Sequence, residues 1–90
     1  MTRADRIKAS LSVFAPCALT VEDESAKHAG HAGASPSGET HYAVIIVSEQ
    51  FTGLSRVERQ RRINAALAAE FQSGLHALSL KALSPVEVPG

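Results

Sequence analysis

Ninety residues suffice for one small domain with a single core, so residues 1–90 are expected to fold as one unit. Nine Lys and Arg residues balance nine Asp and Glu residues, which argues against a chain whose main task is to neutralise nucleic-acid phosphates. The single cysteine excludes an intramolecular disulfide and fits a reducing compartment. No long apolar run follows the N-terminal residues, so the sequence predicts neither a signal peptide nor a membrane anchor, and it favours the cytoplasm.

The first expected element is a helix over residues 3–13. Thr2, with Asp5 three positions later, is suited to cap its N-terminus. Pro16 is expected to end it. Apolar residues recur at helical spacing and should face the core: Ala4, Ile7, Leu11 and Phe14.

Two strands and a loop are expected next. Residues 19–24 alternate with period two, which predicts a strand buried on one face. Residues 26–38 are rich in Gly, Ala and Ser, and we expect them to form a flexible loop. Residues 42–47 are continuously apolar and β-branched, which predicts a central strand. This strand is covered either on both faces, or on one face with the other offered to a partner.

A helical region and a third strand complete the chain. Ser55, with Glu58 three residues later, has the pattern of a capping box. Four residues are expected to face the core from this region: Val57, Ile63, Leu67 and Phe71. Gly74 should end the helix, the alternating residues 76–83 should form a strand, and residues 84–90, with two prolines, should form a frayed tail.

These elements predict an α+β fold in which a three-stranded mixed sheet packs with helices. The first two strands should pair antiparallel, because only a loop joins them, whereas the helical crossover makes the second and third strands parallel. The end of the first strand and the starts of the other two then meet at one end of the sheet. Cys17 should lie at the opposite end, roughly 20 Å away.

All four histidines, His28, His31, His41 and His76, are expected at this one end. Imidazole is the commonest neutral metal ligand in proteins. Taken singly, each histidine has a structural interpretation: His76 as a rim residue, His41 as a residue that fixes the loop, and His28 and His31 as solvated loop residues. Their convergence is what predicts a metal site.

Other chemistries find less support in the sequence. A closed zinc site commonly uses thiolates, and Cys17 is at the wrong end of the sheet; we expect it to be a small buried hydrophobic residue. No serine has an evident base, and no Gly-rich phosphate loop is present, so no enzyme is predicted.

One basic cluster comprises Arg56, Arg59, Arg61 and Arg62. Arg59, Arg61 and Arg62 are the candidates for contacting nucleic acid. The alternative is a solvated helix face with Glu58 among the arginines, and the zero net charge favours that alternative.

Several short motifs follow one another in a specific order: Glu24-Ser25-x-x-His28, a Gly-rich loop, Glu39-Thr40-His41-Tyr42, Val47-Ser48, Phe51-x-Gly53, Arg59-x-Arg61, and His76-Ala77-Leu78 followed by Pro85. In this order and spacing they resemble the BolA family over almost the whole chain. The resemblance implies the order α-β-β-α-α-β of a class II KH-like fold. It also implies a non-enzymatic partner of monothiol glutaredoxins that acts in iron–sulfur trafficking or iron-dependent regulation.

The resemblance further implies a bridging [2Fe–2S] cluster shared with glutaredoxin and glutathione. The family's C-terminal histidine matches His76, and its loop ligand matches His28, with His31 as an alternative; His41 would support the site. The glutaredoxin cysteine and glutathione would supply the other two ligands. The isolated chain should therefore hold no cluster, and it should be a monomer or a weak homodimer.

Two departures limit what the resemblance implies. His31 gives the loop a second candidate ligand that could replace His28. The family pattern often has a histidine where this chain has Gln60, so no role of that histidine can be transferred. Some BolA proteins are described as DNA-binding transcriptional regulators, and the basic helix permits this alternative. KH domains bind nucleic acid through a GXXG loop, which this sequence lacks.

Overall fold

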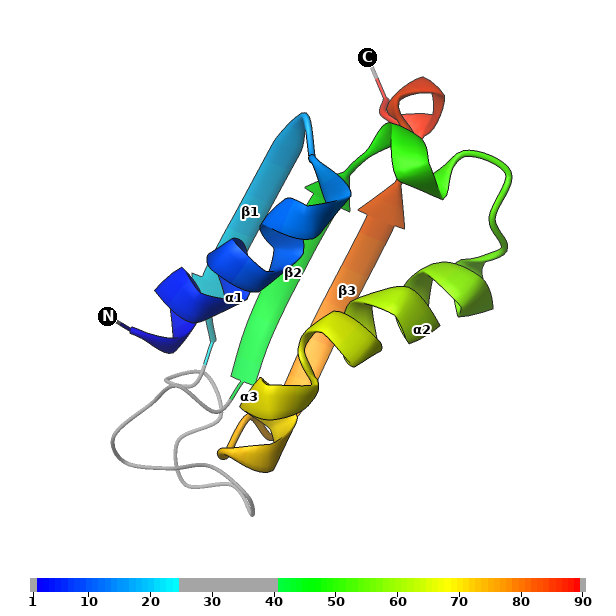
Figure 1. Ribbon diagram of the computed structural model, residues 1–90. Coiled ribbons are helices and arrows are strands. Elements are labelled where there is room, and N and C mark those ends of the chain that lie inside the picture. The colour runs from blue at the N-terminus through cyan, green and yellow to red at the C-terminus, as the bar shows by residue number, and fades with distance from the viewer. Residues whose placement is uncertain (1, 25–40, 90) are drawn as a thin grey trace.

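The computed structural model describes residues 2–24 and 41–89, in which helices cover one face of a three-stranded sheet (Figure 1). The elements are, in chain order, α1 (Arg3–Leu11), η1 (Ser12–Phe14), β1 (Ala18–Asp23), β2 (His41–Val47), η3 (Glu49–Phe51), α2 (Arg56–Ala66), α3 (Ala68–Gln72), β3 (Ala77–Leu83) and η4 (Pro85–Glu87), where η denotes a short 3₁₀ turn. The predicted α+β class and element order are confirmed. The predicted loop over residues 26–38 lies outside the described residues.

The sheet has the order β1-β2-β3, with β1 antiparallel and β3 parallel to the central strand β2. Asp23 lies opposite Tyr42 at one end of the β1–β2 ladder, and Ala18 lies opposite Val47 at the other end. In the parallel ladder, His41 lies opposite Ala77. This register confirms the predicted topology and brings the starts of β2 and β3 together.

Helix α1 begins at a reciprocal capping box. The Thr2 hydroxyl accepts from the Asp5 N–H at 3.2 Å, and the Asp5 carboxylate accepts from the Thr2 N–H at 3.1 Å. The α-helix ends earlier than predicted, at Leu11, and continues as the 3₁₀ turn η1. The Ser12 hydroxyl donates to the Ala9 carbonyl at 2.6 Å, and a side chain that competes for a backbone acceptor in this way favours the change of winding.

The core lies between the helices and one face of the sheet. Its fully buried large side chains come from every layer: Ile7, Leu11, Val44, Ile46, Phe51, Ile63 and Leu67. Leu78, Leu80 and Ala82 of β3 pack against this cluster, as their alternation predicts. Ile45, on the other side of β2, is exposed, so at that point the central strand is covered on one face only.

The inward face of the second helical region differs from the prediction. Val57 is 60% exposed and Phe71 is also exposed, whereas Arg59 and Glu70 are buried. The buried residues 59, 63, 67 and 70 form one stripe with apolar residues in its middle and an ion-paired residue at each end. The chain breaks its helical winding at Leu67, between α2 and α3, so one helical phase cannot be carried from Val57 to Phe71.

The expected frayed tail is also wrong for its first residues. Residues Pro85–Glu87 form the 3₁₀ turn η4, and Ser84 before it is buried. The Glu87 carboxylate accepts from the Ser84 N–H at 2.7 Å and from Arg59 Nη1 at 2.6 Å. A specific long-range ion pair therefore orders a segment whose two prolines suggested fraying.

Candidate functional site

Two of the four histidines meet at the predicted end of the sheet. His41 is the first residue of β2, and His76 directly precedes β3. Their ring centroids lie 5.3 Å apart with an interplanar angle of 50°. His41 is buried and His76 is exposed. The imidazole of His76 therefore faces solvent, and the buried imidazole of His41 lies next to it.

The segment that carries the other two histidines joins the fold at the same end. The Glu24 N–H donates to the His41 carbonyl at 2.7 Å, so the residues that flank positions 25–40 lie side by side. His28 and His31, the predicted loop ligands, lie outside the described residues. Their attachment points are nevertheless next to the His41–His76 pair.

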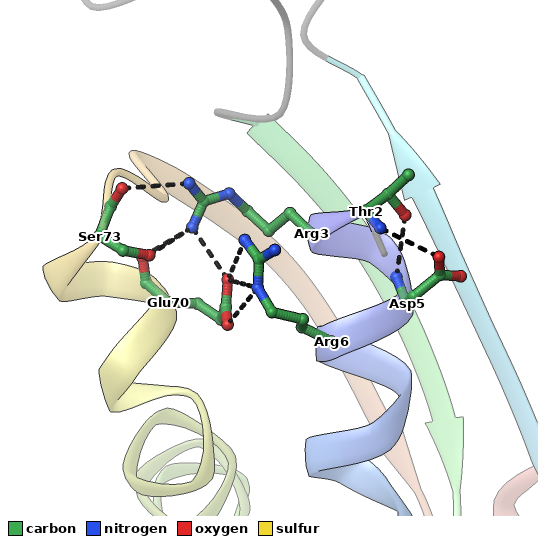
Figure 2. Close-up of polar contacts among 6 residues, drawn as sticks. All are labelled: Thr2, Arg3, Asp5, Arg6, Glu70 and Ser73. Carbon is green, nitrogen blue, oxygen red and sulfur yellow. Dashed lines mark hydrogen bonds and ion pairs between the residues drawn. The ribbon is translucent and has the colours of Figure 1, made fainter.

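The turn before His76 is held by charged residues that the sequence pattern did not connect with the histidines. Figure 2 shows Arg3 and Arg6 of α1 directed at Glu70 of α3. Arg3 Nη1 donates to the Glu70 carboxylate at 2.9 Å, and Arg6 Nε donates to it at 3.1 Å. These partners are more than 60 positions apart in the sequence, so no local spacing could have paired them.

Cys17 lies at the end of the sheet opposite the histidines, as predicted. Its N–H donates to the Val47 carbonyl at 2.9 Å, at the C-terminal end of β2. The expectation that it is buried is wrong, because the residue is exposed. The turn after η1, with Ala15 in a left-handed conformation, leaves Cys17 at the surface rather than in the core.

The described residues alone do not provide a complete set of metal ligands. Within residues 2–24 and 41–89, no three His, Cys, Asp or Glu side chains are grouped so that they could hold a metal ion. The neutral imidazole of an exposed histidine is a suitable donor for zinc, copper or iron. A metal with three or more ligands at His76 would therefore need at least one ligand from outside the described residues.

The arginines of the basic cluster differ in their exposure: Arg59 is buried, whereas Arg61 and Arg62 are exposed. Arg59 is 9% exposed, and it donates to the carbonyls of Leu54 at 3.1 Å and Ala82 at 2.9 Å as well as to Glu87. Its guanidinium is therefore committed to contacts within the fold. Arg61 and Arg62 are exposed and pair with Glu58 at 3.9 and 3.1 Å, which leaves them as the members of the predicted nucleic-acid set that face solvent.

A groove of about 420 Å³ lies between α2 and β3. Among the described residues, its lining includes Arg56 and Lys81, both exposed, and no acidic side chain. It lies along the edge strand β3, and neither His41 nor His76 is among its lining residues. This groove was not predicted, because it needs the packing of α2 beside β3.

Comparison with known proteins supports one family. Among curated proteins, "SufE-like protein 1, chloroplastic/mitochondrial" of Arabidopsis thaliana is 51% identical over 77 residues, which cover 81% of this chain and 21% of that protein. "Protein BOLA1, chloroplastic" of the same plant is 42% identical over 90 residues, which cover 97% of this chain and 56% of that protein. The chain thus spans about a fifth and just over half of the length of these relatives.

Solved structures agree with the fold. The BolA domain of SufE1 from Arabidopsis thaliana has a TM-score of 0.87 and 46% identity, with 98% of each chain covered. BolA1 from Arabidopsis thaliana has a TM-score of 0.87 and 41% identity, with 99% of this chain and 98% of that chain covered. These likenesses extend across the sheet and its helices.

The curated plant relatives carry organelle names, whereas the sequence favours the cytoplasm. Both curated plant relatives are named for the chloroplast, one of them also for mitochondria. In the part of the chain that the structure describes, no helix is long and apolar enough to cross a membrane. The cytoplasmic address stays a prediction.

A sequence profile described as "BolA-like protein" matches residues 11–87. This range includes the whole sheet, the histidine pair and the turn η4. The chain belongs to the BolA-like protein family.

Proposed function

We propose that this protein is a non-enzymatic partner of a monothiol glutaredoxin and co-ligates a bridging [2Fe–2S] cluster, in iron–sulfur trafficking or iron-dependent regulation. One observation carries the proposal: an exposed imidazole, His76, lies against His41 beside the two ends of the histidine-bearing segment. The proposed ligands from this chain are His76 and either His28 or His31.

The donor chemistry fits such a shared site. A [2Fe–2S] cluster takes four protein or thiol ligands, and here two imidazoles would complement a glutaredoxin cysteine and the thiolate of glutathione. When bound, the cluster would supply one-electron redox chemistry, at a potential that imidazole ligands raise relative to thiolates. His76 would bind, and the buried ring of His41 would restrict the orientations that His76 can adopt.

Co-expression with a monothiol glutaredoxin, anaerobic purification and visible circular dichroism test the proposal. His76→Ala should abolish or replace the cluster spectrum of the wild-type complex. His28→Ala and His31→Ala, measured separately, should identify the loop ligand by which of them has the same effect. Cys17→Ser is the matched control, since Cys17 is exposed at the opposite end of the sheet, and it should leave the spectrum unchanged. An unaltered spectrum in His76→Ala would refute the ligand assignment.

A second candidate function is regulation through nucleic-acid binding. The groove between α2 and β3 favours it. Arg56 and Lys81 line this groove, and none of the described lining residues is acidic. Electrostatic binding of this kind weakens steeply with salt. DNA affinity should fall with salt and in Arg56→Ala and Lys81→Ala, and an affinity that is flat in both tests would contradict this candidate.

A further inference from the structure

We infer that Arg3 is a positioning residue for His76, because it fixes the end of α3 and the turn that leads into β3. The inference rests on the proposed function for its significance, since His76 is the proposed cluster ligand. Arg3 precedes the family-matched residues 11–87. The contact therefore involves a part of the chain outside the matched core.

Arg3 reaches the C-terminal end of α3 as well as its carboxylate. Nη1 donates to the Glu70 carbonyl at 3.0 Å and to the Ser73 hydroxyl at 2.9 Å, and Nη2 donates to the Ser73 carbonyl at 3.1 Å (Figure 2). The last carbonyls of a helix have no partner within the helix and carry its negative dipole end. A buried guanidinium supplied by α1 therefore caps α3.

The capped turn leads directly to the histidine. Gly74 has φ of +127°, and the Leu75 N–H donates to the Glu70 carbonyl at 2.9 Å, the same carbonyl that Arg3 contacts. Leu75 is buried in the core, and Ala77 pairs with His41 in the sheet. His76 thus stands between a residue fixed by packing and a residue fixed by the ladder, with Arg3 holding the start of the turn.

Space at the turn is limited on the side of Arg3. A Cβ atom added at Gly74 would lie 3.2 Å from Arg3 Nη2, so the guanidinium packs directly against the turn. Movement of the turn toward α1 is thereby blocked, while the hydrogen bonds oppose movement away from it. Arg3 consequently restrains the backbone that sets where the His76 ring meets His41.

Arg6 offers a matched control within the same network. It donates to both oxygens of the Glu70 carboxylate, at 3.1 and 3.3 Å, but among the described residues it makes no hydrogen bond to the carbonyls of α3 or to Ser73. Its side chain is 41% exposed, against 11% for Arg3. Arg3→Met and Arg6→Met each remove one ion pair to Glu70, and only Arg3→Met also releases the turn.

The test uses NMR on the full isolated chain. Arg3→Met should abolish the nuclear Overhauser contact between the His41 and His76 rings and raise amide exchange at Leu75 about tenfold, while Arg6→Met should change neither appreciably. Exchange at the Ile46 amide of β2 reports global opening and is the reference for both variants. If Arg3→Met does not fold, Arg3→Lys decides, because a lysine keeps the charge but cannot donate to Glu70 and Ser73 in the fork geometry.

A folded Arg3 variant with an unchanged ring contact and unchanged Leu75 exchange would overturn the inference. In the glutaredoxin complex, Arg3→Met should alter the circular dichroism of the cluster, while Arg6→Met should retain the wild-type spectrum. If the wild-type complex binds no cluster, the proposed function fails, but the ring contact in the isolated chain still decides the role of Arg3.

Discussion

Arg59 Nη1 lies 2.6 Å from Glu87 Oε1, which joins helix α2 to the turn η4 across 28 positions of the sequence. Arg59 Nη2 reaches the other carboxylate oxygen at 3.3 Å, so the contact is bidentate. The same guanidinium donates to the Leu54 and Ala82 carbonyls. One arginine thus ties the start of α2, the end of β3 and the C-terminal turn together.

Loss of Arg59 should therefore reduce the free energy of unfolding. Arg59→Met removes four hydrogen bonds to two carbonyls and a carboxylate, and we expect a loss of about 2–4 kcal/mol. Arg61→Met is the control, because Arg61 is exposed and lies 3.9 Å from Glu58; its loss should stay below about 0.5 kcal/mol. Urea unfolding measures both values, and equal losses would contradict the structural role of Arg59.

The free energy of unfolding should depend on pH through the titration of Glu87. Hydrogen bonds from Arg59 and then from the Ser84 N–H and hydroxyl lower the pKa of Glu87 from 4.5 to about 2. Because the folded pKa is the lower one, the stabilisation is complete above pH 4.5 and is lost as the pH falls toward 2. The difference in unfolding free energy between the wild type and Glu87→Gln should shrink across this window.

Asp5 titrates in the same acidic range and must be separated from Glu87. Hydrogen bonds from the Thr2 N–H and hydroxyl hold the pKa of Asp5 below its usual value. Both the wild type and Glu87→Gln keep Asp5, so its effect cancels in their difference. A difference that stays constant from neutral to acidic pH would show that Glu87 is not specifically stabilised in the fold.

The two described glycines with positive φ should respond differently to alanine. Gly53 has φ of +80°, and beyond its chain neighbours no atom of the described residues lies within 4 Å of an added Cβ. Gly53→Ala should therefore cost about 1 kcal/mol from backbone strain. Gly74 has φ of +127° and Arg3 Nη2 at 3.2 Å, so Gly74→Ala adds a steric contact and should cost about 2–3 kcal/mol. Thermal or urea unfolding compares them, and a Gly53→Ala loss equal to or larger than that of Gly74→Ala would be inconsistent with the packing of Arg3.

The corrected inward face of α2 predicts contrasting truncations. Ile63 is fully buried, and Ile63→Ala should reduce the unfolding free energy by about 2–5 kcal/mol through lost burial and a cavity. Val57, on the same helix, is exposed, and Val57→Ala should change stability by less than about 0.5 kcal/mol. Comparable losses from the two variants would restore the original prediction that Val57 faces the core.

The thiol of Cys17 should react in the native protein. Because the residue is exposed, a water-soluble disulfide reagent should label it without denaturant at a rate near that of the unfolded chain. Labelling should leave the ring contact between His41 and His76 unchanged, since Cys17 lies at the other end of the sheet. Labelling that requires unfolding would show that the thiol is buried after all.

Local signals in the sequence were sufficient for the elements and their order. The Thr2–Asp5 capping pair, the period-two pattern that placed Leu78 and Leu80 on the core side, and Gly74 as a stop each depend on neighbours within a few residues. Strand connectivity then implied that His41 and His76 meet, and their rings do lie 5.3 Å apart. Local spacing did not identify the burial of Arg59 and Glu70, because each charge is stabilised by partners from distant elements.

The α+β class, the pairing of the strands and the end of the sheet where His41 and His76 meet could be predicted from the sequence, since hydrophobic period and connection length constrain these features directly. Three features became visible only in the folded structure: the exposure of Cys17, the 3₁₀ turn η4 and the cap that Arg3 forms on α3 beside His76. These features depend on contacts between residues far apart in the chain. The energy of a buried charge is set by the partners that folding brings to it, and a linear pattern does not record them.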